Sequence, residues 1–468
     1  MPPMSAHSDV LVVFGASGDL ARKMTFPSLY RLARRKLLKV PIIGVSFSDW
    51  TDADLKAYAK KAIREAGLRV DAKVFARMTR GMKFVKGDYT KLDTFERVKA
   101  SVGKAKRPLF YLEIPPALFQ TVVYNLSKVG LTENGRVIIE KPFGHDLASA
   151  QALNVSLLKV LREEQLYRID HYLGKEPVQD LLVWRFGNTM FEPVWNRRYI
   201  SNVQITMSET VDVADRGSFY DAVGALKDVV QNHMMQVVAL LAMEPPVSAA
   251  AQCLHDEQIK VFNSMRPIDP VNYVRGQYDG FTKVDGVAKK SRTESYCALR
   301  IDIDSWRWEG VPFFLRTGKA LAAKATEAVV EFRNPPKQLF DDAGCAAPET
   351  NRLRFRLGSD AGVSIEVQAK KPGEGMHSEP IALNVDFAQA LGDSPLPYER
   401  LLGDALAGES TLFASERAVE GTWAAIDPIL GDVGPIRKYA RGSMGPKEAN
   451  RLTAEYGGWV DPIGVKAK

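Results

Sequence analysis

The segment RIDHYLGKE, at residues 168–176, places an acid, an imidazole, a phenol and an ammonium group within a few positions of one another. Asp170 and His171 are of the types that move protons, and Lys175 is of the type that binds anions. The segment could form the wall of a site that holds an anion and transfers a proton. It could also be an exposed loop, and the elements on either side must decide between the two.

The length and composition narrow the class of protein. A chain of 468 residues predicts two or three domains, and 46% hydrophobic with 25% charged residues is typical of a soluble globular protein. The first residues do not resemble a signal peptide, and the longest apolar run, 237–243, is too short to span a bilayer. Cys253, Cys297 and Cys345 are odd in number and widely spaced. We therefore expect a reduced, cytoplasmic protein without disulfides or a metal site.

The charge pattern indicates which partners to expect. The net charge of +7 is modest for the length, and lysines and arginines are scattered apart from short clusters such as RLARRK at 31–36. A nucleic-acid-binding protein usually concentrates its positive charge and interleaves aromatic residues. A small anionic ligand or a simply solvated surface fits this pattern better. We expect no nucleic-acid or membrane partner.

The N-terminal segment DVLVVFGASGDLARKM, at residues 9–24, predicts the first half of a βαβ unit. An apolar strand at 10–14 is followed by Gly15 and Gly18 and then by an amphipathic helix. Glycines at this place allow the backbone to approach a pyrophosphate at the N-terminus of the helix. Glycines after a strand can also serve only to make a turn, so the spacing alone is weak evidence.

Strands and helices continue to alternate up to the RIDHYLGKE segment. Further strands are predicted at 40–47, 82–90, 107–116 and 135–144, with helices at 52–66, 92–101 and 117–129. This order predicts a Rossmann-type parallel sheet in a dinucleotide-binding domain of residues 1–176, with the ligand at the carboxyl ends of the strands. Lys141 lies at such an end, although it could also be a surface lysine.

The remainder, residues 177–468, predicts an α+β domain with one large, mainly antiparallel sheet, because most of its apolar runs alternate as strands do. A helix predicted over 221–246 carries His233 among valines and methionines. A histidine in such surroundings is either a core residue or a neutral imidazole able to accept a proton. Asp228 lies five residues earlier, about 140° around an α-helix, so spacing alone does not place both on one face.

Five motifs together carry a resemblance to a known family. GASGDLA at 15–21, EKPFG at 140–144, RIDHYLGKE, DVVQNH at 228–233 and RTGKAL at 316–321 follow one another at separations that closely resemble the glucose-6-phosphate dehydrogenase family. The resemblance covers nearly the whole chain. It implies an oxidoreductase that oxidises C1 of β-D-glucose 6-phosphate to 6-phospho-D-glucono-1,5-lactone with NADP or NAD, the first step of the oxidative pentose phosphate pathway. It also agrees with our expectation of a homodimer or homotetramer.

The same resemblance implies roles for individual residues. His233 corresponds to the general base and Asp170 to the carboxylate that orients it, which suits removal of the C1 hydroxyl proton. The residues implied in substrate binding are Lys141, His171, Tyr172, Lys175, Glu209, Asp228, Lys319 and Lys324. The residues implied in cofactor binding are Gly15, Ala16, Ser17, Gly18, Asp19, Leu20, Arg22, Ser46, Asp88 and Lys141. No metal ligand is implied.

The chain departs from the family pattern where the 2′-phosphate of NADP would bind. Relatives often have arginine where this chain has Phe47, and lysine where it has Met24. Arg22 and Lys23 could partly compensate. Loss of a charge-assisted arginine contact costs about 1.5–3 kcal/mol, roughly ten- to a hundredfold in affinity. We therefore expect relaxed or NAD-leaning specificity.

Two alternatives remain open on the sequence alone. Another nicotinamide-dependent sugar or polyol dehydrogenase would not need the phosphate-binding lysines Lys175, Lys319 and Lys324. A non-catalytic cofactor-binding relative would be expected to have lost Asp170, His171 or His233, and all three are present.

Overall fold

The computed structural model describes residues 7–336, 350–373, 376–392, 394–463 and 465. Cys345 lies outside these residues. The chain forms two compact units. The first comprises Met1–Lys175, Pro246–Asp256 and Pro395–Glu420, and the second comprises Glu176–Pro245, Glu257–Ser394 and Gly421–Lys468. The division expected at residue 176 did not include the two later segments of the first unit.

The first unit is built on a six-stranded, entirely parallel sheet in the order β3-β2-β1-β4-β5-β6. Its strands are β1 (Val10–Phe14), β2 (Ile42–Ser46), β3 (Lys83–Lys86), β4 (Pro108–Leu112), β5 (Arg136–Glu140) and β6 (Leu166–Ile169). β1, β2 and β4 are buried at every position, as is typical of a parallel sheet covered on both faces. The strand order reverses direction between β1 and β4, where dinucleotides bind in such folds. The predicted Rossmann-type sheet is confirmed.

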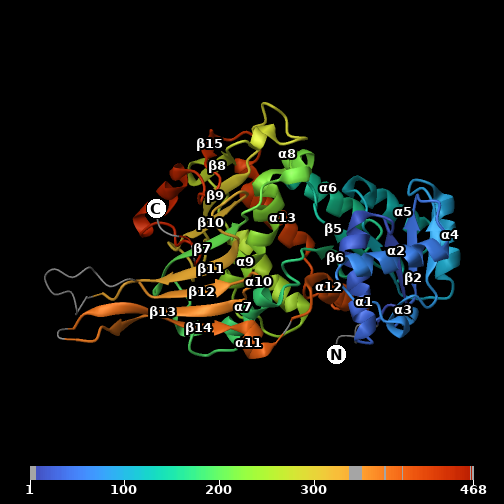
Figure 1. The fold of residues 1–468 in the computed structure, drawn as a ribbon, viewed down its shortest axis with the longest axis horizontal. Helices are drawn as coiled ribbons and strands as arrows, with labels where there is room; N and C mark the ends of the chain where they lie inside the picture. Colours follow the sequence, from blue (N-terminus) through green and yellow to red (C-terminus); the bar gives the residue numbers. More distant parts are fainter. Residues whose placement is uncertain (1–6, 337–349, 374–375, 393, 464, 466–468) are drawn as a thin grey trace. The chain divides into compact units, whose positions relative to one another are not determined.

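Helices connect these strands, in the part of Figure 1 coloured blue and teal. They are α1 (Phe26–Arg34), α2 (Asp52–Glu65), α3 (Ala72–Met78), α4 (Leu92–Val102), α5 (Phe119–Lys128) and α6 (Leu147–Leu158). A π-helical turn, Ala21–Thr25, precedes α1. Thr51 and Asp54 form a capping box at the start of α2. A helix from far along the chain, α12 (Pro397–Ala407), packs against α1.

The second unit is built on a nine-stranded sheet in the order β14-β13-β12-β11-β7-β10-β9-β8-β15. Its strands are β7 (Ile200–Ser208), β8 (Tyr273–Tyr278), β9 (Tyr296–Ile301), β10 (Phe313–Gly318), β11 (Ala325–Phe332), β12 (Arg352–Arg356), β13 (Gly362–Lys370), β14 (Ser378–Asp386) and β15 (Ile436–Tyr439). Only the β7–β10 and β8–β15 pairs within this described sheet are parallel. β13 and β14 run together as a long ribbon, orange in Figure 1. The predicted large, mainly antiparallel sheet is confirmed.

The long helix predicted over 221–246 is not a continuous α-helix. The structure has α8 (Gly217–Ala225), a π-helical segment, Leu226–Met234, and α9 (Met235–Ala242). Gly224 interrupts α8 with φ +72°, a conformation that favours glycine, and a Cβ there would lie 2.4 Å from the Glu294 carboxyl. The prediction was wrong at this point because a periodic apolar pattern does not distinguish these three segments.

The remaining helices are α7 (Glu176–Phe186), α10 (Ala251–Ser264), α11 (Phe387–Leu391) and α13 (Glu416–Ile426). Among the residues described, no helix has both the length and the apolar character needed to cross a bilayer. Cys253 is half-buried and Cys297 is buried, and neither forms a disulfide.

Candidate active site

The loop after β1 has a shape that only glycine permits. Gly15 has φ +86°, and a Cβ built on it would lie 2.1 Å from the Glu113 carbonyl oxygen. A Cβ on Gly18 would lie 3.0 Å from the Gly15 carbonyl oxygen. The loop between β1 and the first helix therefore has two positions, Gly15 and Gly18, at which no side chain covers the backbone. Such a loop fits the pyrophosphate of a dinucleotide, which needs close approach to backbone N–H groups.

Two tyrosines hold this loop in place. The Tyr89 hydroxyl accepts from the Gly15 N–H at 3.0 Å and donates to the Val45 carbonyl at 3.1 Å. The Tyr58 hydroxyl, from α2, lies 3.0 Å from the Ser17 carbonyl oxygen and 3.1 Å from that of Gly18. Burial raises the pKa of Tyr89 to about 12, so the phenol stays neutral and keeps its proton to donate. Neither tyrosine can be recognised from the sequence alone, because only the fold brings α2 and the turn after β3 to the loop.

The charged residues of the loop pair with one another. Asp19 forms ion pairs with Arg22 at 2.8 Å and with Lys23 at 3.1 Å, and Arg22 also reaches Glu65 at 3.2 Å. The hydrogen bonds from Lys23 and Arg22 lower the pKa of Asp19. Ala16 is buried and Leu20 is half-buried at the start of the π-helical turn. The two cations expected to compensate for Met24 therefore already have anionic partners.

The end of β2 presents an aromatic ring and hydroxyl groups. Phe47 is 58% exposed and packs edge-on against Tyr89, with 4.7 Å between the ring centroids. Ser46 is buried and its hydroxyl accepts the Ser48 N–H, while the Ser48 hydroxyl donates to that of Ser17. None of these groups carries a positive charge that could meet a 2′-phosphate.

Asp88, the remaining cofactor-binding candidate, is used within its own turn. Its carboxylate accepts from the Thr90 N–H at 2.8 Å and from the Thr90 hydroxyl at 2.7 Å. These bonds, the one from the backbone N–H first, lower the pKa of Asp88. Asp88 is therefore ionised and stabilises the turn after β3 by accepting these hydrogen bonds.

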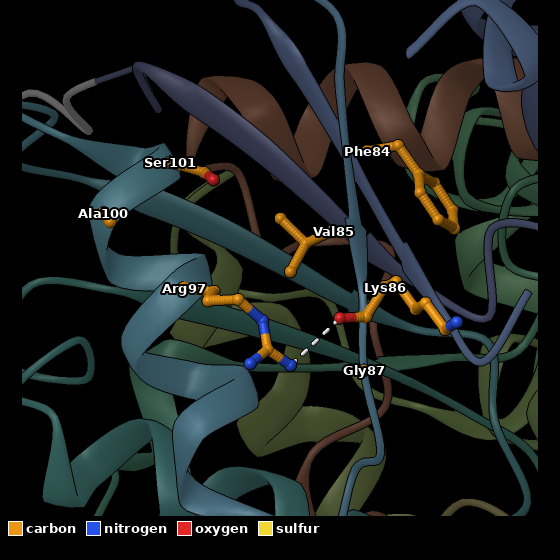
Figure 2. Close-up of a pocket in the computed structure, with 7 residues that line it drawn as sticks. All are labelled: Phe84, Val85, Lys86, Gly87, Arg97, Ala100 and Ser101. Atoms are coloured by element: carbon orange, nitrogen blue, oxygen red, sulfur yellow. Dashed lines mark hydrogen bonds between the residues drawn. The ribbon is translucent and has the colours of Figure 1, made fainter. Parts of the chain in front are cut away.

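An open pocket of about 650 Å³ lies at the edge strand β3 and is lined in part by Gly87, the residue before Asp88 (Figure 2). Val85 points toward α4, whereas Phe84 and Lys86 point away from it (Figure 2). Arg97, which also lines the pocket, donates to the Lys86 carbonyl and to Asp93. The pocket contains none of the predicted site residues, and its arginine is already hydrogen-bonded.

On the other side of the parallel sheet, β5 ends at Glu140 and Lys141 follows it. Glu140 is buried and accepts from the Tyr111 hydroxyl at 2.6 Å and from the Tyr398 hydroxyl, on α12, at 3.3 Å. Burial raises the pKa of Glu140 to about 7, while the two hydroxyls and Lys141 oppose this shift. Lys141 is half-buried at the carboxyl end of the sheet, where it was predicted. The tyrosines that hold its neighbour were missed, since Tyr398 lies more than 250 positions away.

The RIDHYLGKE segment forms a compact turn directly after β6. Asp170 is buried and accepts the Tyr172 N–H at 2.9 Å. The His171 ring stacks against Tyr398, with centroids 6.4 Å apart and planes 15° apart. The Lys175 ammonium lies 3.4 Å from the centroid of the Tyr172 ring. The structure thus brings Asp170, His171, Tyr172 and Lys175 together at the carboxyl edge of the sheet.

In the second unit, Glu209 and Lys319 follow neighbouring parallel strands, β7 and β10. The Lys319 ammonium pairs with Glu209 at 2.5 Å and lies 5.5 Å from the centroid of the Tyr220 ring. The Tyr439 hydroxyl donates to the Lys319 carbonyl at 2.7 Å. Lys324 is exposed just before β11. The predicted Glu209 and Lys319 therefore form one charged pair.

The π-helical segment changes the relation between Asp228 and His233. Hydrogen bonds in a π-helix join residues five apart, so these two residues lie about one turn from each other on the same side. The expectation of a wide angular separation assumed α-helical geometry and is wrong here. His233 is buried, and so are Val230 and Met234 on the same segment. Tyr220, which the sequence analysis missed, is also buried, and burial followed by the Asp228 carboxylate raises its pKa.

Comparisons with known proteins agree with this architecture. Residues 12–180 match the family model "Glucose-6-phosphate dehydrogenase, NAD binding domain", and residues 182–460 match "Glucose-6-phosphate dehydrogenase, C-terminal domain". The chain is 47% identical to glucose-6-phosphate 1-dehydrogenase 1 of Mycobacterium tuberculosis, over 97% of both chains.

Two solved structures are similar over the whole fold. Glucose-6-phosphate 1-dehydrogenase from Mycobacterium avium has a TM-score of 0.92 at 46% identity, covering 99% of this chain and 100% of the other. A glucose-6-phosphate dehydrogenase solved in complex with its substrate glucose-6-phosphate has a TM-score of 0.90 at 32% identity, with the same coverage. The resemblance inferred from the five motifs and the prediction of a nicotinamide-dependent oxidoreductase are confirmed. The chain belongs to the glucose-6-phosphate dehydrogenase family.

Proposed function

We propose that this oxidoreductase oxidises C1 of β-D-glucose 6-phosphate to 6-phospho-D-glucono-1,5-lactone, with NAD or NADP as the hydride acceptor. The carrying observation is that both family domains are present and that all five motifs that carry the assigned residues occur in the chain. The bound nicotinamide would supply the hydride chemistry, and the protein would position the reactants.

His233 is proposed to remove the proton of the C1 hydroxyl as hydride leaves C1. An imidazole titrates near neutrality and so suits this transfer. Asp170, at the end of β6, would hold the imidazole in the correct tautomer and stabilise its charged form.

The remaining polar residues are proposed to bind the sugar phosphate. A phosphate dianion requires several positive or hydrogen-donating groups, a role we assign to His171, Tyr172, Lys175, Lys319 and Lys324. Glu209 and Asp228 would accept from sugar hydroxyls, and Lys141 would contact both sugar and cofactor. The Glu209–Lys319 pair supports this assignment because it places a carboxylate that can accept from sugar hydroxyls beside an ammonium group that can donate to the phosphate.

One assay with a single variant tests the reaction. Reduction of nicotinamide should be observed with glucose 6-phosphate and be far weaker with free glucose, and His233→Asn should reduce turnover by orders of magnitude while sugar-phosphate binding survives. His145→Asn, an exposed histidine, is the matched control and should retain turnover. Equal activity on free glucose would favour a general sugar dehydrogenase, and nearly unchanged turnover of the His233 variant would remove it from the role of base.

For the cofactor, we propose relaxed or NAD-leaning specificity. Phe47 is an exposed ring where relatives often carry arginine, and Arg22 and Lys23 are held by Asp19. Phe47→Arg should shift the ratio of kcat/KM values toward NADP by about ten- to a hundredfold. Val155→Arg, on the exposed surface of α6, should leave the ratio unchanged. A hundredfold NADP preference in the unmodified protein would contradict the proposal.

We also propose a cytoplasmic homodimer or homotetramer. The support for assembly is the edge strand β14, where Ile381, Leu383 and Val385 are all exposed. An edge strand with unpaired backbone groups and apolar side chains is prone to pair with another chain. Light scattering coupled to size-exclusion chromatography should give two or four times the chain mass, and Leu383→Lys should lower that mass.

A further inference from the structure

Glu113 lies where the strand order of the parallel sheet reverses, between β1 and β4. It follows β4, and its N–H donates to the Phe14 carbonyl at the end of β1 at 3.0 Å. Glu113 also lies close against the glycine loop. A Cβ built on Gly15 would be 2.1 Å from the Glu113 carbonyl oxygen and 3.3 Å from the Glu113 Cβ.

Only one of the two carboxyl oxygens of Glu113 has a hydrogen-bond partner. Thr25, the last residue of the π-helical turn after the glycine loop, donates through Oγ1 to Glu113 Oε1. Glu113 Oε2 is enclosed and has no hydrogen-bond partner, although other atoms of the residue reach solvent. An enclosed oxygen without a donor disfavours the carboxylate form, because a buried charge needs compensation.

The described ionisable groups that face Glu113 bring no positive charge to stabilise its carboxylate form. They are phenols and one acid, from α2, the turn after β3, β4, β5 and α12: Tyr58, Tyr89, Tyr111, Glu140 and Tyr398. Burial raises the pKa of Glu113 to about 8, the Thr25 hydroxyl opposes the shift, Glu140 adds to it and Tyr111 opposes it. No cation is among the described groups that shift this pKa. At neutral pH the carboxyl group of Glu113 is therefore mostly uncharged.

We propose that Glu113 is a further determinant of dinucleotide binding that acts in its neutral form, and that ionisation of its carboxyl group weakens that binding. The inference rests on the proposed cofactor site at the glycine loop. A pyrophosphate carries negative charge, and the loop attracts it through backbone N–H groups and the positive end of the following helix. The backbone of Glu113 lies against that loop and its carboxyl group accepts a hydrogen bond from Thr25 in the turn that follows, so a poorly solvated carboxylate there would oppose this attraction.

The test is the dissociation constant of NAD, measured by calorimetry on the full chain without sugar phosphate, between pH 6.5 and 9.5. If only the neutral form binds, the competent fraction falls from about 0.9 at pH 7 to about 0.1 at pH 9, and the dissociation constant rises about tenfold. Glu113→Gln is neutral at every pH and nearly isosteric, so its dissociation constant should stay almost constant over the same range.

Two further variants keep the result interpretable. Glu96→Gln, on the exposed surface of α4, should retain the tenfold change of the unmodified protein. Thr25→Val removes the hydroxyl that lowers the pKa of Glu113, so the weakening of binding should begin at higher pH. This variant tests the inference even if Glu113→Gln does not fold.

The outcomes separate the two proposals. A flat dependence in the unmodified protein, or an equal slope in Glu113→Gln, would overturn the role of Glu113 while leaving the cofactor site in place. Absence of NAD and NADP binding at every pH would remove the cofactor site itself, and the inference with it.

Discussion

Acids with enclosed carboxyl oxygens occur at both sheets of this protein, but they are compensated in different ways. In the parallel sheet, Glu113 and Glu140 are held by hydroxyl groups of threonine and tyrosine. In the antiparallel sheet, Glu327 pairs with Arg354 at 2.8 Å, and Glu331 with Arg352 at 2.7 Å.

The difference shows what a hydroxyl group and a guanidinium group can each do for a buried carboxyl. Burial raises the pKa of Glu327, and the charge and hydrogen bond of Arg354 oppose this. Hydroxyl groups also oppose the effect of burial at Glu113 and Glu140, yet the pKa values still rise to about 8 and about 7. An arginine supplies a positive charge as well as a hydrogen bond, and so favours the ionised form of a buried acid more than a hydroxyl group does. Hydroxyl groups alone leave Glu113 and Glu140 able to hold a proton near neutrality.

Removal of Arg354 should have the largest effect, because it leaves an uncompensated buried charge. Arg354 and Glu327 have side chains only 6% and 5% exposed. We expect Arg354→Met to lower the free energy of unfolding by about 3–5 kcal/mol, measured by urea denaturation. The double variant Glu327→Leu, Arg354→Met should recover much of this loss, since neither charge remains. A single variant as stable as the unmodified protein would show that the pair is not desolvated.

Glu113→Gln should have an intermediate effect of opposite sign. An unfolded glutamate ionises near pH 4.5 and the folded one near pH 8, so between these values the folded state holds the extra proton. The free energy of unfolding of the unmodified protein therefore falls as pH rises from about 4.5 to about 8, and then stops changing on this account. The glutamine variant avoids this loss. The full difference between the two pKa values corresponds to about 4 kcal/mol at pH 8, but Glu113 is only half-buried, so we expect the variant to be more stable by on the order of 2 kcal/mol at pH 8 and close to the unmodified protein at pH 5.

Thermal unfolding at a fixed protein concentration measures this difference. Glu96→Gln serves as the exposed control and should follow the unmodified protein at both pH values. A Glu113 variant that gains no stability at alkaline pH would mean that the carboxyl group ionises without cost in the folded state.

The sequence predicts the features of this comparison that depend on local order. Gly15 and Gly18 stand between a strand and a helix, and Lys141 stands at the end of a strand, so each could be placed from its neighbours alone. The groups that tune the site could not be placed in this way. Tyr398 reaches Glu140 from α12, across more than half the chain, and nothing in its local sequence indicates that contact.

Backbone geometry that departs from the common helix was equally inaccessible. The π-helical segments at Ala21–Thr25 and Leu226–Met234 have apolar patterns that an α-helix would share. In the second segment, the change brings Asp228 and His233 to one side of the helix. Sequence periodicity therefore located the histidine but gave the wrong relation to its neighbouring acid.

The smallest effect is expected for Tyr398→Phe, which removes one of the two hydroxyl groups on Glu140. The lost hydrogen bond, at 3.3 Å, should lower the free energy of unfolding by about 1 kcal/mol. Because that bond lowers the pKa of Glu140, its loss should raise the pKa further, and the destabilisation should be greater at pH 8.5 than at pH 6. Tyr124→Phe, an exposed residue of α5, should change thermal unfolding at neither pH. Equal destabilisation by Tyr398→Phe at the two pH values would show that the hydroxyl group contributes packing and a neutral hydrogen bond only, with no influence on the charge of Glu140.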